Sequence, residues 1–197
     1  TSGLKQIDYR ITDSWADPPK LTEHFHTEKL LRLKNGFLCY RPPENAPEIT
    51  PGPSLNSGHV TFGSFNNLAK LTSDLIKTWA QILKFVPNSH LRLKSKALGD
   101  HVIRKRISQI FSDLGIREDR VTLVPWITNT SPLSAYEDID IGLDTYPYHG
   151  TTTTMEALWM GVPVITLAGH WHASRVGISI LARGKMSALI ATNLSDY

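Results

Sequence analysis

The sequence predicts an α/β fold built on a parallel, doubly wound sheet with helices on both faces. Short apolar segments typical of buried strands alternate with longer segments in which apolar residues recur at helical spacing. This alternation favours parallel strands, because each parallel pair needs a crossover connection, which is usually a helix. The chain has 197 residues, of which 41% are hydrophobic, and this is enough for one such domain with an additional arm.

The first part of the chain differs from the rest and predicts an arm. Residues 1–58 lack a regular apolar period and contain many prolines, which interrupt helices and strands. Within this part we expect a short helix in residues 22–33 and a short strand at residues 37–40. We therefore divide the chain into an arm or linker at residues 1–58 and a Rossmann-like domain at residues 59–197.

From residue 60 onward, strands and helices are expected in alternation. The strands are expected at residues 60–65, 91–93, 121–124, 139–144, 162–167 and 189–191. The spacing of Leu75, Ile76 and Trp79 predicts a helix after the first strand. The next helix is expected to end at Gly115, because glycine readily takes the left-handed conformation that terminates helices. Open parallel sheets bind ligands at the carboxyl ends of their strands, so a site is expected in the loops after the strands.

Composition and charge exclude several classes of function. The net charge is +3, but the basic residues are scattered and form no long run, so nucleic acid is not an expected partner. No apolar segment is as long as a membrane-spanning helix of roughly 18 residues, and the first residues do not resemble a secretory leader. Cys39 is the only cysteine, which excludes an internal disulfide and favours a cytoplasmic or other reducing compartment.

A run of threonines after the strand at residues 139–144 predicts an anion site. Gly150 is followed by Thr151, Thr152, Thr153 and Thr154, and then by a helical segment. Glycine lets the backbone approach a ligand closely, and the first N–H groups of a helix have no partner within it. With the helix dipole, these groups suit a diphosphate. The alternative is that the threonines only cap the helix, although a run of β-branched residues forms a poor helix start.

Two charged residues are expected on the same edge of the sheet. Glu156 lies in the first turns of the helix after the threonines, where a carboxylate can accept hydrogen bonds from both hydroxyls of a ribose. The alternative is a carboxylate that only complements the helix dipole. Lys70 follows the strand at residues 60–65 and can neutralise a phosphate as a point charge. The alternative for Lys70 is an ordinary surface lysine, but the nearby threonine loop favours the phosphate role.

The segment after the strand at residues 162–167 offers further polar side chains. His170 and His172 have the spacing of a metal-binding pair, but no third ligand follows at a suitable spacing, so no metal is expected. We expect Ser174 to cap a helix at residues 176–181, and His172 and Arg175 to reach the phosphate or sugar of a donor. The strands are followed by no Walker or dinucleotide-type glycine loop, and the sequence has no nucleophile elbow.

The order of these motifs along the chain indicates a family resemblance. The segments concerned are residues 62–70, 86–89, 143–163 and 172–177, together with residues 7–13 of the arm. They resemble the C-terminal catalytic lobe of the family that holds the O-linked N-acetylglucosamine transferases and the SPINDLY protein O-fucosyltransferases. The resemblance implies that the Rossmann-like domain is the donor-nucleotide-binding, C-terminal lobe of a GT-B glycosyltransferase, preceded by the arm between the two lobes.

The resemblance also implies an activity and the residues that perform it. The expected reaction is an inverting transfer of a sugar from a nucleotide diphosphate to Ser or Thr of proteins, without a metal or other cofactor. UDP-N-acetylglucosamine (UDP-GlcNAc) is the favoured donor. Lys70 takes the place of the family's donor-phosphate lysine and is the expected catalytic residue, with Asn67 as a neighbouring polar contact. Thr152 and Thr153 match the phosphate-contacting pair, and Glu156 matches the ribose contact.

Departures from the family pattern leave alternatives open. Family members commonly have a histidine before the leucine near the donor base, where this chain has Pro132 before Leu133, so GDP-fucose is the alternative donor. The expected partners are the donor, acceptor proteins, and the family's first lobe and tetratricopeptide repeats, which these residues do not contain. A non-catalytic nucleotide-binding or interaction module is an alternative from another class. An epimerase-like sugar-phosphate enzyme would need a catalytic set that the sequence does not show.

Overall fold

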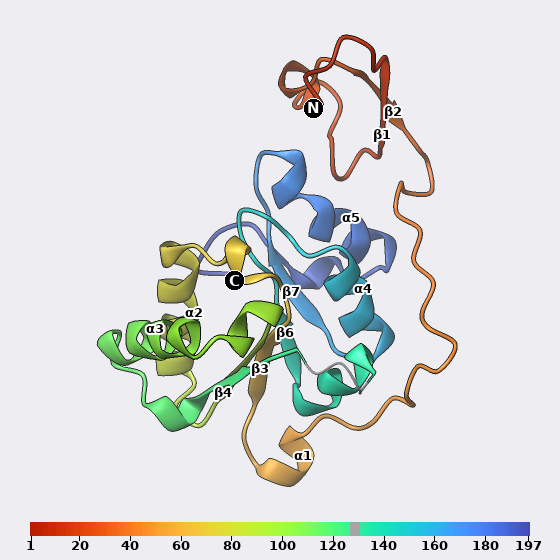
Figure 1. Cartoon of the computed structure of the whole chain (residues 1–197). Coiled ribbons are helices and arrows are strands. Elements are labelled where there is room, and N and C mark those ends of the chain that lie inside the picture. Colours follow the sequence, from red (N-terminus) through yellow and green to blue (C-terminus); the bar gives the residue numbers. More distant parts are fainter. Residues whose placement is uncertain (127–130) are drawn as a thin grey trace.

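The computed structural model describes residues 1–126 and 131–197 and confirms the predicted parallel sheet (Figure 1). The sheet has six strands in the order β5-β4-β3-β6-β7-β8, and neighbouring strands are parallel. The strands are β3 (Thr61–Ser64), β4 (His90–Lys94), β5 (Val121–Val124), β6 (Ile141–Leu143), β7 (Val164–Leu167) and β8 (Ile190–Ala191). The strand order reverses between β3 and β6, as in Rossmann folds, and sheets of this kind bind ligands at that point.

The helices lie between the strands, as the sequence predicts. They are α1 (Ser54–Ser57), α2 (Ser73–Phe85), α3 (His101–Asp113), α4 (Thr152–Trp159) and α5 (Val176–Arg183). Short 3-10 segments occupy Glu23–Phe25, Leu68–Lys70, Lys96–Gly99, Glu118–Arg120, Pro132–Asp138, His172–Ser174 and Ser187–Leu189. The expected end of α3 is confirmed, because Gly115 has a φ of +77°. Across residues 1–126 and 131–197, none of the helices has both the length and the apolar character of a membrane span.

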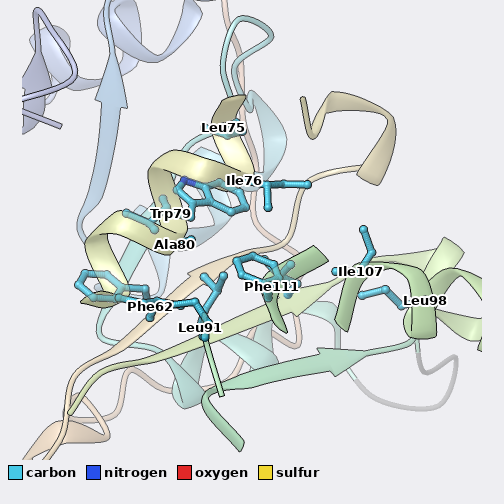
Figure 2. Packing of buried hydrophobic residues seen from close by; sticks show 13 residues of the cluster. Phe62, Leu75, Ile76, Trp79, Ala80, Leu91, Leu98, Ile107 and Phe111 are labelled. Carbon is cyan, nitrogen blue, oxygen red and sulfur yellow. The ribbon is translucent and has the colours of Figure 1, made fainter. Parts of the chain in front are cut away.

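Two hydrophobic clusters pack against the sheet. The first joins α2 and α3 to β3 and β4, with Trp79, Phe111, Phe62 and Leu91 among its members (Figure 2). The second contains Phe65 together with residues of α4 and β7. Phe62 and Phe65 are three positions apart in an extended segment, so their side chains point to opposite faces. Both faces of the sheet are therefore covered by apolar side chains, so a polar site is expected at the ends of the strands.

The arm forms a small sheet of its own, next to α5 in Figure 1. β1 (Tyr9–Thr12) pairs in parallel with β2 (Lys29–Arg32). The predicted helix in residues 22–33 is therefore wrong, since that segment contains only the 3-10 turn Glu23–Phe25 and β2. The predicted strand at residues 37–40 is also wrong, because that segment has no regular structure. The helix is replaced because residues 29–32 pair with β1, and such pairing overrides local spacing. The strand does not form because residues 37–40 pair with no strand among the residues described.

Buried aspartates attach the arm to the domain. The carboxylate of Asp13 accepts hydrogen bonds from Ser179 Oγ at 2.5 Å and from Arg183 Nε at 3.2 Å, both on α5. The carboxylate of Asp17 contacts His172 Nδ1 at 2.6 Å. Neither aspartate has exposed surface, and buried carboxylates require several donors, so these bonds fix the arm in place. The boundary at residue 58 stays a prediction, and the segments on its two sides contact each other.

Candidate active site

Lys70 lies at the carboxyl end of β3, at the edge where the strand order reverses. Its Nζ donates hydrogen bonds to Asn66 Oδ1 at 3.2 Å and to the carbonyl oxygen of His149 at 2.8 Å. The same atom stands 4.5 Å from the ring centre of Tyr148. Burial lowers the pKa of Lys70, and the negative charge of Asp144 acts in the opposite direction. The loop after β3 is thus joined to the loop before α4 by a partly buried ammonium group.

The start of α4 packs closely around Gly150, and the expected approach of a ligand to this glycine stays a prediction. A Cβ atom at Gly150 would stand 2.5 Å from Thr153 Oγ1, 2.7 Å from Thr154 Oγ1 and 3.2 Å from Asn66 Oδ1, so only glycine fits there without displacement. Thr151 precedes the first helical residue and makes no side-chain capping bond. The interpretation of the threonine run as a simple helix cap is therefore not supported at Thr151. Thr152 is exposed and Thr153 is partly buried at the same end of the helix.

Asn66 connects the two halves of this site, and sequence reasoning missed it. The residue is 6% exposed, and its side-chain Oδ1 accepts hydrogen bonds from Lys70 Nζ and from Thr153 Oγ1 at 3.1 Å. The adjacent Asn67, which the family resemblance selects, is exposed, and its Oδ1 accepts from Ala69 N at 3.0 Å in the turn. Both asparagines stand in the same motif, and only the tertiary structure shows which one is buried between the two loops.

A buried polar network in the interior of the domain holds the loop before α4. Asp144 is 2% exposed, and its carboxylate accepts hydrogen bonds from Gly150 N at 2.6 Å, from Thr145 N at 2.8 Å and from Thr166 Oγ1 at 2.7 Å. His149 is 1% exposed, and its Nδ1 accepts from Gly177 N at 3.1 Å. The sequence contained a signal for this network. An aspartate directly after an apolar strand is expected to be buried, and a buried carboxylate needs partners, since unpaired carboxylates are rarely buried.

Glu156 lies one helical turn beyond the threonines, beside a buried tyrosine. Tyr136 donates from its hydroxyl to the carbonyl oxygen of Thr153 at 2.9 Å and to Glu156 Oε2 at 3.2 Å. Burial raises the pKa of Glu156, while the bond from Tyr136 and the charge of Lys94 lower it. The half-buried carboxylate therefore has a partner that helps to keep it ionised. Its role as a ribose contact stays a prediction.

The structure places His172 and Arg175 at the carboxyl end of β7, where both contact the arm. Asp17 binds the imidazole of His172, and Arg175 donates from Nε to the carbonyl oxygen of Trp15 at 3.0 Å. The Nη1 atom of Arg175 also donates to the carbonyl oxygen of Gly169 at 2.8 Å. His172 and Arg175 thus use these polar atoms for contacts within the chain. Their expected contact with the phosphate or sugar of the donor stays a prediction. Among the residues described, no group of three or more His, Cys, Asp or Glu side chains is arranged to hold a metal ion.

The expected cap of α5 is wrong. Ser174 belongs to the 3-10 segment His172–Ser174, and the residue at the N-cap of α5 is Arg175. The hydroxyl of Ser174 instead bonds to the backbone of Trp171, donating to its carbonyl oxygen at 2.9 Å and accepting from its N–H at 3.3 Å. The physical reason is that this hydroxyl closes the 3-10 turn locally, which uses it before the helix starts.

The segment that departs from the family pattern lies beside the carboxyl end of β4. Pro132 begins the 3-10 segment Pro132–Asp138, and its carbonyl oxygen accepts a hydrogen bond from Lys94 Nζ at 3.3 Å. Next to it, a cavity of about 580 Å³ opens at the carboxyl ends of β3, β4 and β5. The cavity is lined by Phe65, Asn67, Ser95, Lys96, Ala97 and Trp126. Asn67, one of its lining residues, belongs to the same loop after β3 as Lys70.

Comparisons with known proteins agree with this geometry. The sequence profile of glycosyl transferase family 41 matches residues 53–197. A probable UDP-N-acetylglucosamine–peptide N-acetylglucosaminyltransferase SPINDLY of Petunia hybrida is 50% identical, over 100% of this chain and 21% of that protein. The corresponding probable transferase SEC of Arabidopsis thaliana is 31% identical, again over 100% of this chain and 21% of the relative.

A solved structure extends the comparison to the fold. A mutant of the Thermobaculum terrenum O-GlcNAc transferase superposes with a TM-score of 0.90 at 36% sequence identity, covering 96% of this chain and 36% of that one. The chain spans about a fifth of the length of the curated relatives. The resemblance seen in the sequence and the predicted GT-B lobe are confirmed. The profile match, the relatives and the shared fold together establish that this chain belongs to glycosyl transferase family 41.

Proposed function

We propose that this chain is the donor-binding part of a protein O-glycosyltransferase, which transfers a sugar from a nucleotide diphosphate to Ser or Thr hydroxyls. One observation supports this most directly: Lys70 Nζ and Thr153 Oγ1 meet at Asn66, beside the first turn of α4. An ammonium group, hydroxyls and the N-terminus of a helix together form a site for a diphosphate. The names of the relatives provide independent support for the reaction class.

The chemical role of the site follows from the charge that develops in the reaction. The acceptor hydroxyl attacks the anomeric carbon, the bond to the diphosphate breaks, and negative charge grows on the leaving group. A cation placed at that group stabilises the transition state more than the ground state, and this difference accelerates the transfer. Lys70 is the candidate for this role, and the hydroxyls and N–H groups of Thr152 and Thr153 would share the charge. The base that takes the acceptor proton would come from the partner lobe.

For the donor, we favour UDP-GlcNAc, because the relatives are named as transferases that use it. Glu156 would accept hydrogen bonds from the ribose, with its carboxylate held by Tyr136. GDP-fucose is the second candidate, because Pro132 stands where family members commonly have a histidine near the base. Acceptor proteins, a partner lobe, tetratricopeptide repeats and a cytoplasmic location complete the proposal. No metal or other cofactor enters the proposed reaction.

Calorimetric titration with UDP, GDP and their sugars tests the proposal. We expect one nucleotide to bind, and Lys70→Ala to weaken that binding by about tenfold or more, as expected for loss of a charge-assisted hydrogen bond. Lys77→Ala is a matched control, since Lys77 is an exposed lysine on the outer side of α2. Tighter binding of GDP than of UDP would select the fucose donor. If none of the nucleotides binds, or if Lys70→Ala binds like the parent protein, the proposed site is wrong.

A further inference from the structure

One peptide group in the candidate site is contacted by charged side chains at both ends. The carbonyl oxygen of His149 accepts a hydrogen bond from Lys70 Nζ at 2.8 Å. The N–H of Gly150, on the same peptide bond, donates to Asp144 Oδ1 at 2.6 Å. The C=O and N–H of a trans peptide point in opposite directions. The ammonium and the carboxylate therefore stand at opposite ends of one peptide dipole, each beside the end of opposite partial charge.

The surroundings of Asp144 fit an ionised carboxylate. Its hydrogen-bonding partners are the N–H groups of Thr145 and Gly150 and the hydroxyl of Thr166, and all of them donate. An ionised carboxylate only accepts, so this set of donors matches the charged form. Burial raises the pKa of Asp144, and the hydrogen bonds from Gly150 N, Thr166 Oγ1 and Thr145 N oppose that rise. A carboxylate without exposed surface keeps its charge only where such partners are fixed.

The neighbouring histidine fits the neutral form, so it does not cancel the charge of Asp144. The Nδ1 of His149 accepts from Gly177 N at 3.1 Å, and its Nε2 lies 2.9 Å from the carbonyl oxygen of Leu167. This pattern requires the proton on Nε2 and an unprotonated Nδ1. Burial lowers the pKa of His149, and the charge of Asp144 opposes that change. Other titratable groups around this assembly are Tyr146, Tyr148, Arg175 and Tyr197.

We propose that Asp144 is a positioning residue for the donor site, which acts through the peptide group between His149 and Gly150. The carboxylate fixes the backbone of the loop that approaches the diphosphate, and its charge holds Lys70 as a cation in a half-buried place. This inference rests on the proposed function, because the diphosphate is the group that needs the cation. Asp144 itself has almost no exposed surface and is not placed in contact with the donor.

The substitution Asp144→Asn separates the charge from the hydrogen bonds. An amide oxygen can still accept from the N–H groups of Gly150 and Thr145, and the amide nitrogen can donate to the hydroxyl oxygen of Thr166. The loop therefore keeps its support, whereas Lys70 loses the charge that opposes its deprotonation. The expected defect is weaker nucleotide binding that becomes worse as the pH rises, a dependence that a purely structural role would not produce.

The experiment is calorimetric titration of UDP and GDP into the full-length protein between pH 6 and pH 10. We expect Asp144→Asn to bind about tenfold more weakly than the parent at pH 8, and its loss of affinity in alkali to begin at lower pH. Asp140→Asn is the control for loss of a carboxylate away from the site: Asp140 precedes the opposite end of β6, where its Oδ1 accepts from Ser54 N and its Oδ2 from Thr61 N, so the amide loses one of these bonds. It should follow the parent profile. Lys70→Met should lack the part of the alkaline loss that comes from deprotonation of Lys70.

Each other outcome has a distinct meaning. An unchanged pH profile in Asp144→Asn, or the same change in Asp140→Asn, would overturn the role of Asp144. Absence of nucleotide binding by the parent protein would refute the proposed function. Near-UV circular dichroism checks folding. If Asp144→Asn does not fold, Thr166→Val removes one of the donors that keep the carboxylate ionised. Compared with the control Thr166→Ser, it should weaken nucleotide binding most at the low end of the pH range, where Asp144 is protonated first. A Thr166→Val profile equal to that of Thr166→Ser would then overturn the inference.

Discussion

Lys70 and Asp144 contact opposite ends of the peptide bond between His149 and Gly150. Lys70 follows β3 and Asp144 follows β6, the neighbouring strands at which the order of the sheet reverses. This relationship joins the loops on both sides of the reversal point without direct contact between the two charged groups. Backbone groups therefore hold the two loops together as well as side chains do.

Asn66→Ala should weaken nucleotide binding by about tenfold, because Lys70 and Thr153 lose the acceptor that holds them together. Calorimetry with the preferred nucleotide measures the change. Asn88→Ala is the control, since Asn88 is exposed at the opposite edge of the sheet. Equal affinities for the Asn66 and Asn88 variants would show that Asn66 does not organise the site.

Gly150→Ala should lower the free energy of unfolding by about 1–3 kcal/mol, the usual range for overpacking, and should also weaken nucleotide binding. The added Cβ would stand 2.5 Å from Thr153 Oγ1, and the start of α4 must shift to relieve this contact. Urea unfolding gives the first quantity and calorimetry the second. Gly99→Ala is matched to it, because a Cβ at Gly99 meets no atom within 4 Å. A fully stable, fully binding Gly150→Ala protein would contradict the described packing.

Tyr136→Phe should shift the loss of nucleotide affinity in acid to higher pH. The Tyr136 hydroxyl donates to Glu156 and lowers the pKa of that carboxyl, which burial raises. Without this bond the pKa of Glu156 rises further, so the carboxylate is protonated at higher pH and no longer accepts from both ribose hydroxyls. Calorimetry between pH 4 and pH 7 tests this, with Tyr9→Phe in the arm as the control. Identical acid profiles would argue against Glu156 as the ribose contact.

Asp17→Ala should release the arm and reduce stability by about 3 kcal/mol, because it leaves buried donors without a partner. Burial raises the pKa of Asp17, but the hydrogen bonds from His172 and Thr12 outweigh it and hold that pKa well below its usual range. A depressed folded-state pKa means that the contribution is complete above the unfolded-state pKa, about 4, and is lost as the pH falls below it. Hydrogen exchange of residues 8–17 should therefore accelerate in the variant at neutral pH.

The acid behaviour supplies a second test of the same contact. The unfolding free energy of the parent protein should fall more steeply below about pH 4 than that of Asp17→Asn, which has no carboxyl to protonate at this position. Asp113→Asn, on the exposed side of α3, is the control and should keep the parent slope. Parallel slopes for the parent and Asp17→Asn would show that Asp17 is not held by the described hydrogen bonds.

Local patterns in the sequence were sufficient to predict the parallel sheet and the helices between its strands. The apolar strands and the spacing of Leu75, Ile76 and Trp79 are local features, and a parallel sheet follows from their alternation. The arm was different, because the segment at residues 29–32 becomes a strand only by pairing with β1, which lies far from it in the sequence. Local spacing contains no information about which segments pair, and so it predicted a helix where residues 29–32 pair with β1, and a strand at residues 37–40, which pair with none of the described strands.

The sequence by itself determined that Lys70, the threonines after Gly150 and Glu156 follow strands of one sheet, and therefore lie at one edge. Only the tertiary structure decided that Asn66 is buried between Lys70 and Thr153, and that Asp144 supports Gly150 from within the domain. The physical reason is burial. Residue types and their spacing indicate which groups can form a site, but the folded backbone decides which are removed from water and must find partners.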